Sequence, residues 1–135
     1  DTTISVMELL SKDSLEFTDS DRALILEAVK TAGGSRSLPT QTTGIVILHG
    51  TDTLQVTGEL VHAAYAAPRV PIVLVGAWRP YEMTRSDALQ NLTEALFSTG
   101  VLPPGVYAVA HGRALRFPGV VKDRARGTFV GGTER

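Results

Sequence analysis

The sequence predicts an α/β domain built on a doubly wound, mainly parallel sheet with helices on both faces. Short apolar runs rich in β-branched residues alternate along the chain with longer segments whose apolar residues recur at helical spacing. The runs are apolar at successive positions, which is typical of strands buried between two layers of helices. A length of 135 residues, 43% of them hydrophobic, corresponds to one domain with a substantial core.

The first expected element is a strand at 4–10, followed by a polar turn at 13–21. Thr18 and Asp21 have the spacing of a helix capping box, so a helix should begin there. Two glycines at 33 and 34 should end this helix. Its predicted inward face carries Leu24, Ile25, Ala28, Val29 and Ala32.

A polar loop at 35–43 leads to three strands, which are expected at 44–48, 71–75 and 106–110. Two helices separate these strands. Their predicted inward residues are Leu54, Val61, Ala64 and Tyr65 in one, and Ala88, Leu89, Leu92, Ala95 and Leu96 in the other. The remaining residues, 113–135, are expected to form a loop with one short strand at 119–121.

Ligands of doubly wound sheets bind beyond the carboxyl ends of the strands. The loops at 49–53, 76–87 and 111–124 should therefore line one site. The turn at 11–18 is expected to join them.

Thr51 and Asp52 stand between a predicted strand and a predicted helix, where unpaired backbone N–H groups favour negative charge. Gly50 would let the backbone approach a ligand closely. The alternative is that Asp52 only caps the helix, with Gln55 returning the hydrogen bond. Position alone favours capping, but capping requires neither a threonine on each side of the aspartate nor a His-Gly pair before it.

Other polar side chains also allow two interpretations. Lys122 would serve as a base toward a threonine hydroxyl if it reaches the same crevice, whereas a lone lysine is usually solvated. Ser14 would bind a ligand carboxylate, or would simply form a turn. Asp87 would supply negative charge at a helix start, and Asn91 would be a packing amide.

Composition excludes several classes of site. The chain has no cysteine, which excludes disulfides and thiolate chemistry, and its three histidines lack metal-ligand spacing, so no metal or cofactor is predicted. With 13 basic and 14 acidic residues, the charge gives no reason to expect a nucleic-acid or membrane partner. The last 23 residues carry six basic and two acidic side chains, which indicates either attraction of an anionic substrate or a solvated basic tail.

Five segments resemble motifs of the bacterial-type L-asparaginases, and they occur in the family's order. Residues 44–54, with His-Gly-Thr-Asp-Thr at 49–53, resemble the family's second signature. Residues 71–80 are similar to its strand ending in G-A-M-R-P, and residues 86–92 resemble its A-D-G-x-x-N-L segment. The turn at 13–18 resembles its D-S-S-D-M-T motif, and Val121-Lys122 resembles part of its V-T-K loop.

The resemblance implies a flavodoxin-like, three-layer fold and the hydrolysis of L-asparagine to L-aspartate and ammonia. It implies a catalytic triad of Thr51, Asp52 and Lys122. Lys122 would activate the Thr51 hydroxyl, while Asp52 would balance the lysine charge and bind the substrate's α-amino group. Ser14 would bind the α-carboxylate.

Gly50, Ala77 and Leu15 complete the implied substrate site. A backbone N–H of Gly50 or of its neighbour would stabilise the oxyanion, and the Ala77 carbonyl would face the substrate's amide. Leu15 stands where the family has a polar residue, so we expect asparagine to be favoured over glutamine. Trp78 replaces a smaller apolar residue and would reshape the site, and Asp123 stands where threonine is usual and would stabilise the charged lysine.

Two parts of the family pattern have no match in the chain. The family's T-G-G-T-I segment, which carries a second essential threonine, is expected to lie before Asp1. The family's C-terminal domain, which helps close a neighbour's site across a dimer, is expected to be absent. Residues 1–135 would then form one N-terminal-type domain of a short-chain member.

The leading hypothesis is therefore a cytoplasmic asparagine amidohydrolase that needs no cofactor and assembles as a homo-dimer or homo-tetramer. One alternative is an ammonia-generating component of a tRNA-dependent amidotransferase, which shares this type of domain. Another is a domain that binds asparagine or aspartate without catalysis.

Overall fold

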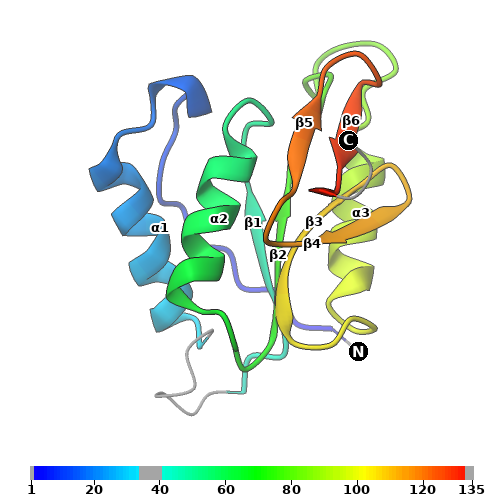
Figure 1. Cartoon of the computed structure of the whole chain (residues 1–135). Helices are drawn as coiled ribbons and strands as arrows, with labels where there is room; N and C mark the ends of the chain where they lie inside the picture. Colours follow the sequence, from blue (N-terminus) through cyan, green and yellow to red (C-terminus); the bar gives the residue numbers. More distant parts are fainter. Residues whose placement is uncertain (1, 34–40, 133–135) are drawn as a thin grey trace.

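The computed structural model describes residues 2–33 and 41–132 (Figure 1). A 3-10 turn, three α-helices and six strands occur in these residues. In chain order they are η1 Ser14–Glu16, α1 Asp19–Thr31, β1 Ile45–Leu48, α2 Leu54–Ala64, β2 Pro71–Val75, α3 Ala88–Ser98, β3 Gly105–Ala110, β4 Arg113–Arg116, β5 Val121–Asp123 and β6 Thr128–Val130.

Strands β1 to β4 form one sheet in sequence order. The first three strands are parallel, with Ile45 opposite Ile72 and Pro71 opposite Gly105, and β4 runs antiparallel to β3. Strands β5 and β6 form a separate antiparallel pair. Because α2 and α3 each connect two parallel strands, the chain is a mixed α/β sheet with crossover helices, as the sequence predicts.

Helices cover both faces of this sheet. Alternating residues of the fully buried strand β2 point to opposite sides: Leu74 packs in one cluster with Leu54 of α2, and Val73 packs in another with Ala95 of α3. Figure 1 shows α1 and α2 on one side of the sheet and α3 on the other. The prediction of a doubly wound, three-layer α/β fold is confirmed.

Helix α1 begins at the predicted capping box. The Thr18 hydroxyl accepts a hydrogen bond from the Asp21 N–H, and the Asp21 carboxylate accepts one from the Thr18 N–H. Lys12 forms an ion pair with the same carboxylate, at 2.7 Å. Gly33 follows the helix with a φ of 96°, a conformation that favours glycine.

The predicted strand at 4–10 is wrong. These residues form no strand, and most of their apolar side chains are exposed, Val6 by 86%. A strand forms only where a neighbour completes its ladder of hydrogen bonds, and in the described chain no other strand pairs with this segment. The prediction of β1 as a fully buried strand fails for a related reason. It is the edge strand of the sheet, and Leu48 is 70% exposed.

The predicted inward faces of the helices are partly wrong. Ile25, Val29, Leu54, Val61 and Ala95 are buried as expected. Four other residues that were predicted to face inward are exposed: Leu24, Ala64, Leu89 and Leu96. Each helix therefore buries a narrower stripe of its surface than its apolar pattern predicts. Of the predicted loop at 35–43, residues 35–40 lie outside the described residues.

The C-terminal part forms strands β4, β5 and β6 where the sequence predicts a loop with one strand at 119–121. Strands β3 and β4 are joined by His111 and Gly112, whose φ angles of 53° and 76° match a two-residue hairpin turn. Short strands with alternating exposure, such as Arg113–Arg116, lack the continuous apolar run that marks β2.

Candidate active site

The carboxyl ends of β1 and β2 lie close together because Gly76 has no side chain. A Cβ atom at Gly76 would lie 2.2 Å from the His49 carbonyl oxygen, far inside van der Waals contact. The His49 N–H donates to the Val75 carbonyl, which extends the parallel pairing by one residue. The two following loops therefore start side by side at one edge of the sheet.

Lys122 of β5 reaches the loop after β1. Its Nζ donates hydrogen bonds to the Thr51 hydroxyl at 2.9 Å and to the Asp52 carboxylate at 2.6 Å. The Lys122 side chain is only 8% exposed, and Thr51 is buried. The structure thus brings together a hydroxyl, an amine and a carboxylate from positions about 70 residues apart.

Two more groups surround this cluster. The Lys122 Nζ lies 4.4 Å from the centroid of the Trp78 ring, within cation–π distance. Arg124 donates to the same Asp52 oxygen that Lys122 contacts, at 2.9 Å. The hydrogen bond from Lys122, aided by the one from Arg124, lowers the pKa of Asp52 although burial opposes this. Asp52 is therefore a carboxylate near neutral pH, facing two cations.

The capping interpretation of Asp52 is wrong. The N-cap of α2 is Thr53, and the Asp52 carboxylate turns toward Lys122 and Arg124 instead. Gln55 donates to the Asp52 backbone carbonyl at 3.4 Å rather than completing a capping box. The side chain of Asp52 is thus available to the site instead of being used to start the helix.

Ser14 lies at the same edge of the sheet. Its Oγ accepts a hydrogen bond from the Thr53 N–H at 3.3 Å, and its carbonyl accepts one from the Thr53 hydroxyl at 2.8 Å. A Cβ atom at Gly50 would lie 2.8 Å from the Ser14 Oγ, so the glycine permits this contact. The turn at 11–18 therefore joins the other loops, and the buried Ser14 hydroxyl faces the start of α2.

Leu15 and Ala77 are the more peripheral of the predicted site residues. The Leu15 side chain is 65% exposed. Ala77 lines a shallow, mainly apolar hollow of about 330 Å³ between the edge of the sheet and α3. Thr51, Asp52 and Lys122 are not among the residues that line this hollow. We place the chemistry at the polar cluster, because a hydroxyl meets an amine there.

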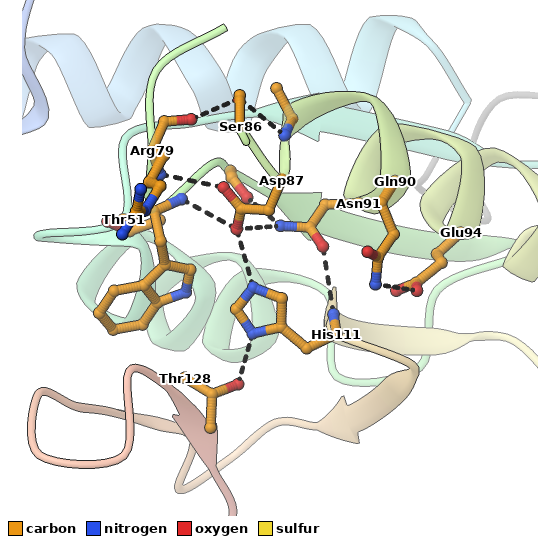
Figure 2. Close-up of polar contacts among 12 residues, drawn as sticks. Thr51, Arg79, Ser86, Asp87, Gln90, Asn91, Glu94, His111 and Thr128 are labelled. Carbon is orange, nitrogen blue, oxygen red and sulfur yellow. Dashed lines mark hydrogen bonds and ion pairs between the residues drawn. The ribbon is translucent and has the colours of Figure 1, made fainter. Parts of the chain in front are cut away.

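Asp87 and His111 form a second polar network, which contacts the backbone of Trp78 and is shown in Figure 2. The Asp87 carboxylate accepts hydrogen bonds from the backbone N–H groups of Trp78 and Arg79, at 3.1 and 2.9 Å. His111 contacts the same carboxylate through Nε2 at 2.7 Å and the Thr128 hydroxyl through Nδ1 at 2.9 Å. Burial raises the pKa of Asp87, but the hydrogen bonds from the Arg79 N–H and His111 outweigh it and lower the pKa to about 2.

For Asp87, the sequence predicts only a negative charge at a helix start, and for His111 it predicts no role. Asp87 does precede α3, but its carboxylate makes no capping hydrogen bond and instead holds the preceding loop. Asn91 is more than a packing amide, because it donates to Gly76 and Asp87 and accepts from the His111 N–H. The His-Gly dipeptide at a hairpin turn was the signal that could have placed His111 at this edge.

Asp123 does not stabilise the lysine as expected. Its carboxylate pairs with Arg126, through the backbone N–H at 3.0 Å and the side chain at 3.4 Å. The counter-ion of Lys122 is Asp52. Among residues 2–33 and 41–132, no cluster of three or more potential metal ligands occurs, and none of the described helices is long and apolar enough to span a membrane.

This arrangement matches a known protein family. A family model described as "Asparaginase, N-terminal" matches residues 1–128, which include every element described above as far as the start of β6. The chain belongs to the asparaginase family. The resemblance noted in the sequence is thereby confirmed.

Relatives of two kinds share this asparaginase domain. One is a component of the glutamyl-tRNA(Gln) amidotransferase of Pyrobaculum aerophilum, to which the chain is 35% identical over 102 residues, covering 74% of this chain and 23% of that protein. The other is an L-asparaginase from Thermococcus kodakarensis, to which it is 42% identical over 64 residues, covering 47% of this chain and 20% of that protein.

A solved structure, the thermostable L-asparaginase from Thermococcus kodakarensis, superposes with a TM-score of 0.82 at 30% identity. The match covers 96% of this chain and 38% of that one. The chain thus spans about a fifth of the length of the curated relatives and just over a third of the solved structure.

Proposed function

We propose that this asparaginase-family chain carries the amide site of an L-asparagine amidohydrolase, which releases L-aspartate and ammonia. The observation that carries the proposal is the contact of the Lys122 amine with both the Thr51 hydroxyl and the Asp52 carboxylate. Amide hydrolysis through a hydroxyl requires a base beside that hydroxyl and a group that balances the base's charge. This cluster supplies both from buried or partly buried side chains.

In the proposed reaction, Lys122 accepts the proton of the Thr51 hydroxyl in the step in which that oxygen acts on the amide carbon. The lysine must be neutral in that step, and the proton it gains passes to the amide nitrogen as the C–N bond breaks and ammonia leaves. A water molecule then cleaves the resulting ester, which releases L-aspartate and restores the Thr51 hydroxyl. Asp52 stabilises the charged form of the lysine and offers a carboxylate to the substrate's α-ammonium group. A backbone N–H of Gly50 or Thr51 stabilises the oxyanion, since both precede α2.

The remaining substrate contacts are assigned by the same chemistry. The Ser14 hydroxyl is proposed to hold the α-carboxylate together with the backbone at the start of α2, which it already contacts. The Ala77 carbonyl is proposed to face the amide nitrogen. Leu15 offers no polar group to a longer side chain, which supports a preference for asparagine over glutamine.

The proposal is tested by ammonia release from L-asparagine and by calorimetric binding of L-aspartate. Lys122→Met and Thr51→Ala should each lower turnover by about a hundredfold or more, because each removes one partner of the proton transfer. Lys30→Met and Thr93→Ala change the same residue types at exposed positions and should leave turnover unchanged. Full activity in either site variant would exclude the assigned roles.

A second function is an ammonia-generating component of a tRNA-dependent amidotransferase, favoured by the match of 74% of the chain to a component of such an enzyme. A protein of this kind would release ammonia efficiently only with its partner subunits. A third is a domain that binds asparagine or aspartate without hydrolysing it. Calorimetry that shows binding while the assay shows no ammonia would exclude the first function. Ammonia release after the partner subunits are added would then favour the second function, and continued absence of ammonia would favour the third.

A further inference from the structure

Three segments meet at the Lys122 ammonium. The loop after β1 supplies Thr51 and Asp52, the loop after β2 supplies the Trp78 ring, and β5 supplies the lysine itself. The hydrogen bonds fix two directions around the ammonium, and the ring lies at its side, 4.4 Å away. The position of Trp78 relative to β5 therefore decides how much of the ammonium is shielded from water.

The loop that carries Trp78 is anchored by hydrogen bonds to residues at its C-terminal end. The backbone N–H groups of Trp78 and Arg79 both donate to the Asp87 carboxylate, nine and eight residues further along the chain. The Ser86 hydroxyl closes the same loop by donating to the Arg79 carbonyl at 2.6 Å (Figure 2). Asp87 is thus the anchor that sets where Trp78 stands.

His111 joins this anchor to the hairpin that carries Lys122. Its Nε2 contacts Asp87 and its Nδ1 contacts the Thr128 hydroxyl, on opposite sides of one ring (Figure 2). In the β5–β6 pair, Thr128 stands opposite Asp123, and Lys122 stands opposite Phe129. The imidazole of His111 therefore links the loop that carries Trp78 to β6, the strand that pairs with the strand of Lys122.

The backbone of His111 is fixed as well. The His111 backbone N–H donates to the Oδ1 of Asn91, an amide that is almost fully buried, and His111 occupies a hairpin turn with positive φ. Neutral and protonated imidazole both keep the two side-chain contacts. The Nε2–H donates to Asp87 in each form, and the Thr128 hydroxyl donates to Nδ1 or accepts from it.

We propose that His111 is a positioning residue that holds Trp78 over the Lys122 ammonium by linking Asp87 to Thr128. It touches none of the reacting groups assigned above. Without the link, the Trp78 loop and the hairpin are held together less firmly, although the Trp78 ring still packs against Phe129. The ammonium then becomes more hydrated and its contact with Thr51 loosens. That Lys122 acts on an amide rests on the proposed function, whereas the link between the two segments does not.

The test uses the fluorescence of Trp78, which is the only tryptophan in the chain, so all tryptophan emission comes from this ring and reports on its surroundings. In His111→Asn, the amide can still reach Thr128 and tolerates positive φ, but it is too short to reach Asp87. We expect its Trp78 emission to shift to longer wavelength and to be quenched more by acrylamide. L-aspartate should bind on the order of tenfold more weakly. His62→Asn, at a partly exposed position of α2, is the matched control and should behave as the wild type.

Two further variants keep the test decisive. Thr128→Val removes only the hairpin end of the link with little change of volume, and should reproduce the fluorescence change even if His111→Asn folds poorly. Trp78→Phe should reduce the effect of His111→Asn on L-aspartate affinity, since the histidine acts through that ring. Unchanged emission and affinity in both folded variants, His111→Asn and Thr128→Val, would overturn the proposal. If the wild type binds no L-aspartate, the proposed function fails, while the fluorescence still decides the role of His111.

Discussion

At the scale of single residues, Asp52 has the most crowded charge environment of the candidate site. One of its oxygens accepts from both Lys122 and Arg124. Arg124 is 71% exposed, so the contact is screened by water and contributes little to stability. It nevertheless places a cation where the proposed α-ammonium group of the substrate would bind.

Arg124→Ala should therefore favour ligands that carry an α-ammonium group. L-aspartate and succinate differ only in that group and are not hydrolysed, so their affinity ratio isolates the effect. We expect calorimetry to show the ratio shifting toward L-aspartate by about threefold, and to show the shift shrinking in high salt. Arg126→Ala, whose side chain pairs with Asp123 instead, is the control. An equal change for both ligands would mean that Arg124 and the α-ammonium group do not compete.

The carboxyl of Asp87 should make the stability of the fold depend on pH. Its carboxyl is 15% exposed and has a pKa of about 2, below the ordinary aspartate value that the unfolded chain has. Such a group stabilises the fold above about pH 4, and its contribution is lost as the pH falls toward 2. Asp87→Asn should cost about 2 kcal/mol at pH 7, and the difference from wild type should narrow below pH 4.

Urea unfolding at pH 7, 4 and 3 measures this difference. Glu82→Gln removes an exposed carboxyl from the same loop and should change the free energy of unfolding by less than about 0.5 kcal/mol at each pH. A constant gap between wild type and Asp87→Asn at all three values would show that the carboxylate charge is not what holds the loop.

At the scale of elements, the packing of α2 depends on a glycine within the helix. A Cβ atom at Gly58 would lie 2.0 Å from the ring of Phe117, which is 1% exposed and has no room to move away. Gly58→Ala should destabilise the protein by about 1–3 kcal/mol despite the better helix propensity of alanine. Gly100→Ala, where the nearest atom is an ordinary contact at 3.5 Å, should be tolerated in the same unfolding experiment.

The elements also show which parts of the fold are readable from the sequence. Strands β2 and β3 were predictable because burial on both faces requires a continuous apolar run. Residues 4–10 have a similar pattern but no strand beside them, and a pattern cannot show whether a partner is present. Strands β4 to β6 were missed because half-exposed strands of three or four residues carry too few apolar positions to stand out.

The candidate site divides in the same way. Thr51 and Asp52 could be singled out because they come shortly after a strand with a continuous apolar run, where ligand sites of such sheets lie. The side-chain partners of His111 could not be predicted, because they are 24 and 17 residues away and only the fold brings them together. The role of Asp87 was hidden by its place before a helix, where a cap is the simpler interpretation.

At the scale of the whole molecule, β1 forms one edge of the sheet. Within residues 2–33 and 41–132, β1 pairs only with β2, and its residues Ile45–Leu48 are all apolar. Natural sheets usually protect such an edge with charge, proline or a covering segment. Exposed apolar side chains at 4–9 add to the apolar surface of the described chain.

We therefore expect the 135-residue chain to self-associate through the β1 edge, in line with the homo-oligomer predicted from the sequence. In sedimentation equilibrium, its apparent mass should rise above 14.4 kDa as concentration increases. Leu48→Lys places a charge on the edge strand and should return the mass toward the monomer value. Phe97→Lys removes a similarly exposed apolar side chain and should leave the association unchanged, because Phe97 belongs to α3 and not to the edge strand. A constant mass of 14.4 kDa for the wild type would contradict the prediction. Equal loss in both variants would mean that the association follows apolar surface in general and not the strand edge.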